Sequence, residues 1–358
     1  MPATANPAGN LHGHCFTPDR RWSARMELDF AVRQGRTTLA KMRFHGPLRV
    51  QRPFYPEAAP ASGPASAQGR AQASQPCHCC LLHPPGGLVS GDDLSLEVRL
   101  REGAHALLTA PSASKFYAAD AHNVAQRQTT DLTVTGGMLE WLPRETIIYD
   151  GARAEMRTSV DLDNASACIG WEMLCLGRPA ANESFTHGSV RQSLMLSREG
   201  LPLLHEVLRF EGGDALQKYA CGLGGQAVAA TLFAVGRGAA ADDTTDYAGP
   251  NFAGRDLAAL EACCTALQNM LAPRSDFDDA PAGQDPASEA SVRAAPAPLS
   301  AHMGERAGAT VRGGVLVARY LGPDMEEARA LLLTAWNLLR PALTGCPPHM
   351  PRIWYGAF

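Results

Sequence analysis

Five side chains that can bind a transition metal lie close together in the first third of the chain: Cys77, His78, Cys79, Cys80 and His83. Thiolate and imidazole groups are good ligands for nickel, zinc and copper, so this cluster is the strongest metal signal in the sequence. A closed structural site usually takes two separated ligand pairs, and the sequence contains no second C-x-x-C. The cluster alone therefore predicts a partial site.

The spacing of this cluster limits what it can bind. If the segment is a strand, Cys77 and Cys79 share one face while His78 and Cys80 share the other. The four side chains then do not converge easily on one ion. We keep Cys77, His78 and His83 as candidate ligands. Burial as small apolar side chains is the alternative for most of the ten cysteines, since free Cys is among the most buried residue types.

Four other polar residues lie in or beside apolar stretches. Glu172 lies in a stretch that is apolar on both faces, where a carboxylate must find a partner, a metal ion or a proton. Asp92 begins an alternating strand, although Asp is also a favoured turn residue. Ser114 and Lys115 lie in a proline-bounded loop, where a solvated lysine is the alternative.

Signatures of several enzyme classes are absent from the sequence. It contains no G-x-x-x-x-G-K-[ST] phosphate-binding loop and no G-x-S-x-G nucleophile elbow. The pair His205 and Glu206 lacks the second histidine of the H-E-x-x-H zinc motif. These absences favour a protein without catalytic residues of its own.

Hydrophobic alternation predicts a chain built mainly from short strands. Apolar and polar residues alternate from Trp22 to Val32 and again from Leu94 to Leu100, which indicates half-buried strands. Further strands are predicted at 36–44, 105–110, 124–134, 138–142, 154–162, 167–176, 190–196, 203–210, 227–235 and 311–321. Turn signals every eight to twelve residues, roughly, are typical of sandwiches, so we expect a large β-sandwich-like arrangement, a supersandwich.

Two segments have helical spacing instead. Residues 255–271 repeat leucine and cysteine at helical intervals, and a second helix, near the C-terminus, runs from an Asp324 cap to Pro341. Glu327 lies where a capping-box partner is expected. Trp336 falls on the apolar stripe of this second helix.

The remaining composition predicts one large domain at 21–358 with three irregular regions. Residues 1–20 read as a loose tail, and Pro/Ala-rich insertions at 58–76 and 273–310 are too poor in apolar residues to order themselves. The net charge of −4, with scattered Lys and Arg, argues against nucleic-acid binding. No apolar run is long enough to cross a membrane, and no signal peptide is evident, so we expect a cytoplasmic protein.

Six blocks along the chain resemble a known family. Residues 83–94 read HPPGGLVSGDDL, which looks like the core signature of the urease accessory protein D family (UreD, called UreH in some organisms). The other blocks are GPLRVQRPFYPE (46–57), GAHALLTAPSASKFY (103–117), LEWLPRETIIYDGA (139–152), WEMLCLGRPAANESFTHG (171–188) and PPHMPRIWY (347–355).

This resemblance implies a non-enzymatic urease maturation protein that binds the apoprotein of urease and recruits UreF and the GTPase UreG. Nickel would be a transient cargo that moves through an internal passage. The resemblance implies that four residues of this chain line that passage: Asp92, Ser114, Lys115 and Glu172. Glu172 stands where Asp is more usual in the family. The missing phosphate-binding loop agrees with GTP hydrolysis by a partner.

The C-terminal helix and the last residues are candidate docking surfaces. Trp336, Trp354 and Tyr355 are the candidate anchors, because aromatic residues dominate binding hot spots. Core packing is the alternative for them. Two other functions stay open: a metal-dependent enzyme that uses the Cys77–His83 cluster with Asp92, and a structural adaptor with no metal role.

Overall fold

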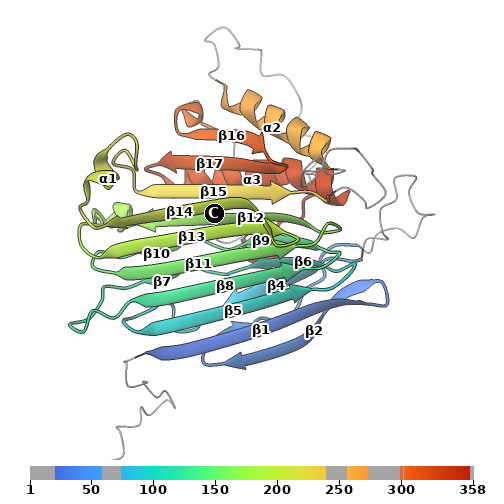
Figure 1. Ribbon diagram of the computed structural model, residues 1–358, viewed down its shortest axis with the longest axis horizontal. Helices are drawn as coiled ribbons and strands as arrows, with labels where there is room; N and C mark the ends of the chain where they lie inside the picture. Colours follow the sequence, from blue (N-terminus) through green and yellow to red (C-terminus); the bar gives the residue numbers. More distant parts are fainter. Residues whose placement is uncertain (1–20, 59–73, 239–255, 273–298, 301, 355–358) are drawn as a thin grey trace, which may run out of the picture.

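The computed structural model describes residues 21–58, 74–238, 256–272, 299–300 and 302–354. The predicted tail, most of both predicted insertions and Tyr355 lie outside these residues. Within them the chain forms seventeen β-strands and three α-helices. The mainly β class and the sandwich arrangement expected from the alternating pattern are confirmed (Figure 1).

Seven strands form one sheet, called sheet I. Their order across the sheet is β14 (Leu201–Glu211), β13 (Ser189–Arg198), β11 (Arg153–Leu162), β8 (Gln126–Val134), β5 (Asp92–Leu100), β1 (Trp22–Arg33) and β2 (Arg36–His45). The edge pairs β1–β2 and β13–β14 are antiparallel hairpins, and the first turns at Gly35 as expected. The inner pairs, from β1 through β5, β8 and β11 to β13, are all parallel.

Ten strands form the other sheet, called sheet II. Eight of them follow the order β16 (Ala307–Arg312), β17 (Val315–Gly322), β15 (Val228–Val235), β12 (Ala167–Leu176), β9 (Met138–Leu142), β6 (His105–Thr109), β4 (Cys77–Leu82) and β3 (Arg49–Val50). The short strands β7 (Ser114–Phe116) and β10 (Thr146–Ile148) continue β6 and β9, and β10 pairs with both β7 and β12. The pairs β4–β6, β6–β9 and β9–β12 are parallel.

Successive strands alternate between the two sheets, and this explains the parallel pairing. The chain passes from β5 in sheet I to β6 in sheet II, and it repeats this step from β8 to β9 and from β11 to β12. Parallel neighbours need a crossover connection, and here a strand of the opposite sheet provides it. The middle of the molecule is therefore a flattened coil of strands.

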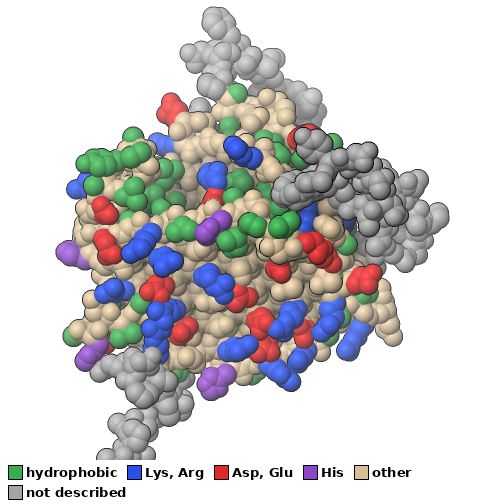
Figure 2. Space-filling view, viewed as in Figure 1, with side chains coloured by type: hydrophobic (Ala, Val, Ile, Leu, Met, Phe, Trp, Pro, Cys, Tyr) green, Lys and Arg blue, Asp and Glu red, His purple; other side chains and the backbone are tan. Residues whose placement is uncertain are grey.

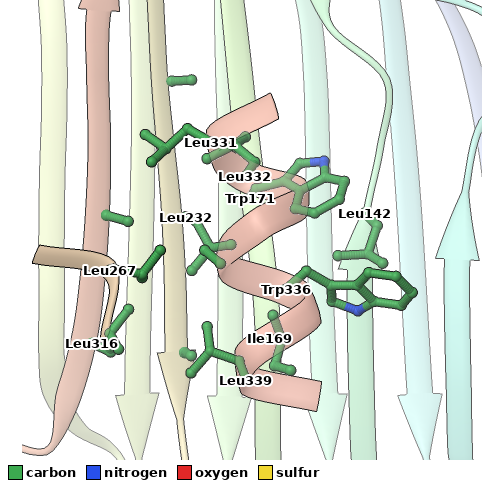
Figure 3. Packing of buried hydrophobic residues seen from close by; sticks show 14 of the residues in the cluster. Leu142, Ile169, Trp171, Leu232, Leu267, Leu316, Leu331, Leu332, Trp336 and Leu339 are labelled. Atoms are coloured by element: carbon green, nitrogen blue, oxygen red, sulfur yellow. The ribbon is translucent and has the colours of Figure 1, made fainter. Parts of the chain in front are cut away.

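The molecule has three layers. Apolar side chains from both sheets fill the space between them, and α2 (Leu257–Leu271) with α3 (Met325–Thr344) covers the outer face of sheet II. Figure 3 shows the Trp336 ring of α3 on the side of Leu142 and Leu339 near Ile169, all within one apolar cluster. A third helix, α1 (Ala215–Lys218), is a single turn. No helix within the described residues combines the length and apolar character needed to span a membrane.

The outer face of sheet I carries the polar half of the alternating pattern. Figure 2 shows basic and acidic side chains interspersed over this face. Several form ion pairs between neighbouring strands, such as Arg157 with Asp131 at 2.7 Å and Arg127 with Glu155 at 2.6 Å. Exposed pairs of this kind each contribute little to stability, so the face is a solvated surface held mainly by the core beneath it.

Two predictions near the C-terminus are corrected. The predicted strand 311–321 is a hairpin of β16 and β17, because Gly313 and Gly314 adopt positive φ angles of 56° and 75° and turn the chain. Residues 303–310, expected to be disordered, form a short 3₁₀ turn (Met303–Glu305) and the greater part of β16. Ordered structure therefore resumes earlier than the composition indicates.

The Asp324 cap of α3 is as predicted, but the role of Glu327 and the end of the helix are not. The Glu327 carboxylate accepts hydrogen bonds from Arg306 and the Tyr320 hydroxyl, at 3.0 and 2.8 Å, instead of closing a capping box. The Asp324 carboxylate caps the helix by accepting hydrogen bonds from the backbone N–H groups of Glu326 and Glu327, at 2.7 and 3.4 Å. Pro341 does not end the helix, which continues for one turn to Gly345. That glycine has φ of 73° and donates its N–H to the Pro341 carbonyl at 2.9 Å. The proline removes one backbone N–H, and buried residues on both sides of it, Leu339 and Leu343, hold the helix against the sheet across this position.

Candidate functional site

A cavity of about 160 Å³ lies between the two sheets. Apolar side chains from both sheets form much of its wall, among them Met26, Leu96 and Trp141. Polar side chains also line it: Ser114, Gln128, Thr130, Thr158, Glu172 and Gln192. A concave apolar space with a few convergent polar groups is the usual form of a ligand site, so this cavity is the candidate site.

Glu172 is the one carboxylate that lines this cavity within the described residues. The alternation of β12 turns Trp171 toward the helices and Glu172 toward sheet I. Gln192 of β13 donates from Nε2 to Glu172 Oε2 at 2.7 Å, and Thr158 of β11 forms a second hydrogen bond. Two strands of sheet I therefore hold a carboxylate that belongs to sheet II.

The surroundings of Glu172 bring the pKa of its carboxyl group close to neutral pH. Burial raises the pKa of Glu172 to about 7, and the nearby charge of Glu206 adds to the rise. The hydrogen bonds from Thr158 and Gln192 favour the charged form and oppose it. Near neutral pH a small change in the electrostatic surroundings is enough to shift this carboxyl group between its protonated and its ionised form. A bound divalent cation would be such a change, because it favours the ionised form.

Of the other predicted passage residues, one lines the cavity, and two are not among its lining residues. Ser114 lines the cavity, with its Oγ 3.4 Å from Gln128 Oε1. Lys115 is the next residue of β7 and is not among the lining residues. Asp92 is buried at the start of β5, where its Oδ2 accepts a hydrogen bond from the Val89 N–H at 2.8 Å. Turn formation, the alternative stated for Asp92, is thus part of its role.

The cysteine–histidine cluster is divided by its strand, as the alternation predicted. Cys77 and Cys79 face the core between the sheets, with their Sγ atoms 3.8 Å apart. His78 is also buried, and its Nε2 lies 2.6 Å from Glu57 Oε1. His83 follows β4 and lines the cavity, where burial lowers its pKa and leaves a neutral imidazole at pH 7.

No group of three His, Cys, Asp or Glu side chains is placed to hold a metal ion anywhere in the part of the chain that the structure describes. The three candidate ligands therefore do not form a preassembled site, and the metalloenzyme alternative has no site built from the Cys77–His83 cluster with Asp92. The cavity instead offers scattered oxygen and nitrogen donors, among them Glu172 and His83. Such donors can hold a cation weakly and release it.

Sequence reasoning missed a second buried carboxylate, Glu140, on the opposite face of sheet II. Its side chain is fully buried, and Arg340 of α3 donates from Nε to both carboxylate oxygens at 3.0 and 3.1 Å. Trp336 Nε1 donates to Oε2 at 2.6 Å, and His105 Nε2 lies 2.7 Å from Oε1. Arg340 also donates to Glu57 Oε1 at 2.7 Å, so one guanidinium joins α3 to two other segments.

The signal for Glu140 was present in the sequence. Glu140 lies between Leu139 and Trp141 in a strand that is apolar on both faces, as Glu172 does in its own strand. The two carboxylates differ because only Glu140 has a guanidinium beside it. Burial opposes its ionisation, but the Arg340 charge and the hydrogen bonds outweigh burial and lower the pKa of Glu140 to about 2. Glu140 is therefore a permanent anion of the scaffold.

The predicted docking anchors lie in the core. Trp336 is fully buried against Glu140, and Trp354 is 2% exposed, with its Nε1 donating to Thr109 Oγ1 at 3.1 Å. Trp354 also stacks on Trp171 with ring centroids 5.8 Å apart. An anchor must reach the surface, so the core-packing alternative describes both tryptophans. Tyr355 lies outside the described residues.

Comparison with known proteins agrees with the blocks noted in the sequence. The UreD urease accessory protein family profile matches residues 23–355. A protein named urease accessory protein UreD from Chromohalobacter salexigens is 39% identical over 353 residues, which cover 98% of this chain and 94% of that protein. Proteins of the same name from Marinobacter nauticus and Pseudoalteromonas translucida are 39% and 35% identical over 359 residues, and each alignment covers at least 97% of both chains.

Proposed function

This chain belongs to the UreD urease accessory protein family, and from that membership we propose that it assists the delivery of nickel to urease through its internal cavity. In this proposal the protein is not an enzyme. It is a maturation scaffold that binds the apoprotein of urease together with UreF and the GTPase UreG, in the cytoplasm. Nickel is its transient cargo.

The observation that carries the proposal is Glu172 inside the cavity between the sheets. Burying polar and ionisable groups costs stability, and this cavity nevertheless holds a titratable carboxylate and a neutral imidazole, those of Glu172 and His83, which favours a functional role for it. Carboxylate and imidazole groups suit divalent nickel. A conduit must bind loosely, which agrees with the lack of three converging ligands among the described residues.

The exchange of charge at Glu172 follows from its surroundings. With a proton, Glu172 is neutral and its burial is inexpensive. When a dication binds, the carboxylic acid would release that proton to water, and the ion would then balance the negative charge of the carboxylate, which no guanidinium balances there. Gln192 keeps the carboxylate oriented in both states through its donated hydrogen bond.

The test compares cells that carry the urease genes with the wild-type protein, with its gene deleted, or with Glu172→Gln. Glutamine keeps the size of the side chain and an acceptor for Gln192 but cannot carry the charge. We expect the deletion to abolish urease activity. We expect Glu172→Gln to lower the nickel content of purified urease by about tenfold or more, the range seen when a group that tunes a metal site is lost.

Glu155→Gln is the matched control, because Glu155 lies on the outer face of β11 in an exposed pair with Arg127. It should leave nickel loading unchanged. A pull-down of urease must show that every variant still forms the complex. Normal loading with Glu172→Gln and an intact complex would refute the conduit and favour a structural adaptor, while active urease after gene deletion would refute any maturation role.

A further inference from the structure

The wall of the cavity contains a break in the strand ladder of sheet II. The chain leaves the ladder at 110–113, between β6 and β7, and again at 143–145, between β9 and β10. β6 pairs with β9 and β7 pairs with β10, and between these pairs a backbone hydrogen bond from the Ser114 N–H to the Glu145 carbonyl, at 2.9 Å, joins the two short segments. We call this loosely paired part of the sheet the window.

A second, much smaller cavity lies on the helix side of that window. Its volume is about 10 Å³, close to the space of one water molecule. Arg329 and Leu332 of α3 and Trp354 line it together with three residues that also line the large cavity, namely Pro143, Arg144 and Met173. The window therefore brings the interior of the sandwich next to the helix layer.

Charged side chains stand at this window. Arg144 borders both cavities, and its Nε lies 3.5 Å from Glu145 Oε2. Arg329 donates from NH2 to Glu145 Oε1 at 2.7 Å. Each of these three side chains is only 10% exposed, so their charges act in a poorly screened environment.

We infer that Arg144 is a barrier that keeps a divalent cation from leaving the large cavity through this window. The inference rests on the proposed nickel conduit and names the residue that would keep the ion between the two sheets. A dication that approached the helix side would meet two guanidinium groups, those of Arg144 and Arg329, and one carboxylate buried with them, that of Glu145. The charge of these three groups is net positive, whereas Glu172 on the wall of the space between the sheets attracts the ion. The cation therefore stays between the sheets until it reaches the end of its path.

The test is a nickel titration of urease activation in cells that carry the urease genes. Arg144→Leu removes the charge, Arg144→Lys retains it, and Arg209→Leu is a control on the exposed side of β14. We expect Arg144→Leu to need about tenfold more nickel for half-maximal activation, because a charge in a poorly screened site governs passage by an order of magnitude. Maximal activity at saturating nickel should be preserved, and Arg144→Lys and Arg209→Leu should match the wild type.

Two results would overturn the inference. If Arg144→Leu follows the wild-type titration, Arg144 is no barrier. If Arg144→Leu and Arg144→Lys shift equally, the shape of arginine matters and its charge does not. Failure of the conduit is distinguished by Glu172→Gln: normal nickel loading in that variant refutes the passage beside Glu172, whereas a charge-dependent shift at Arg144 supports a barrier on whichever route the ion takes.

Discussion

Replacing Arg340 by methionine removes a cation that serves two buried carboxylates. Arg340 is fully buried and binds Glu140 through its Nε and Glu57 through its NH2. Methionine occupies a similar volume without a charge. Both carboxylates would then have to be protonated or rehydrated, and the contact of α3 with sheet II would loosen.

The pKa of Glu140 sets the size of the effect. Its fall from an ordinary 4.5 to about 2 corresponds to about 3 kcal/mol of folding free energy, because a tenfold change in proton affinity is worth about 1.4 kcal/mol. Removing one partner of a buried ion pair typically costs about 3–5 kcal/mol of folding free energy, which agrees with this value. We therefore expect Arg340→Met to lower the free energy of unfolding by about 3 kcal/mol at pH 7.

The same reasoning sets the pH dependence. The folded pKa of Glu140 lies below the unfolded value, so its contribution is fully present above about pH 4.5 and is lost as the pH falls toward about 2. The difference between wild type and Arg340→Met should therefore be largest near neutral pH. It should shrink steadily in acid.

Urea denaturation followed by tryptophan fluorescence measures both effects, because Trp336 donates a hydrogen bond to Glu140. Arg157→Met, which breaks an exposed pair with Asp131, is the control and should cost less than about 1 kcal/mol. The double variant Arg340→Met with Glu140→Gln should regain part of the loss. A loss below about 1 kcal/mol at pH 7, or one that does not diminish toward pH 3, would refute the buried-pair reasoning.

Two further predictions concern the cavity and the glycine-rich motif. Burial raises the pKa of Glu172 in the folded protein to about 7, above its ordinary 4.5, so wild-type stability should fall as the pH rises from about 4.5 to about 7. Glu172→Gln should abolish that fall, which urea denaturation midpoints measured at several pH values would show. Gly87→Ala should lower stability by about 1–3 kcal/mol in thermal unfolding, because a Cβ there would lie 2.4 Å from the Tyr117 ring. Gly308→Ala, whose Cβ would meet nothing within 4 Å, should be neutral.

Local pattern was enough to predict most elements of this fold. The alternation of apolar and polar residues located the longer strands and also which side chains share a face, as in the division of Cys77 from His78. It did not locate the short strands β3, β7 and β10, or β16. The Asp324 cap and the spacing of α2 and α3 located the helices. These features depend on residues a few positions apart, so they can be read without knowing what the chain packs against.

The function-bearing signals in the sequence were of two kinds. A carboxylate in an apolar strand marks a polar site whatever the fold, and this reasoning found Glu172, although it was not applied to Glu140. The family blocks identified the maturation class. The sequence could not separate an exposed aromatic anchor from a core residue, which is why Trp336 and Trp354 were assigned to docking as well as to packing.

Only the tertiary structure decided how these parts meet. The coil of strands between two sheets makes the pairing parallel, and alternation along one strand carries no information on its neighbours. Glu172 meets Gln192 across the two sheets at the wall of the cavity, and Arg340 pairs with Glu140 at a separation of 200 residues. The sequence by itself determined which residues share a face of a strand and which residue caps a helix. The three-dimensional contacts determined that the charge of one buried carboxylate is compensated by a guanidinium while the other carboxylate is left to titrate.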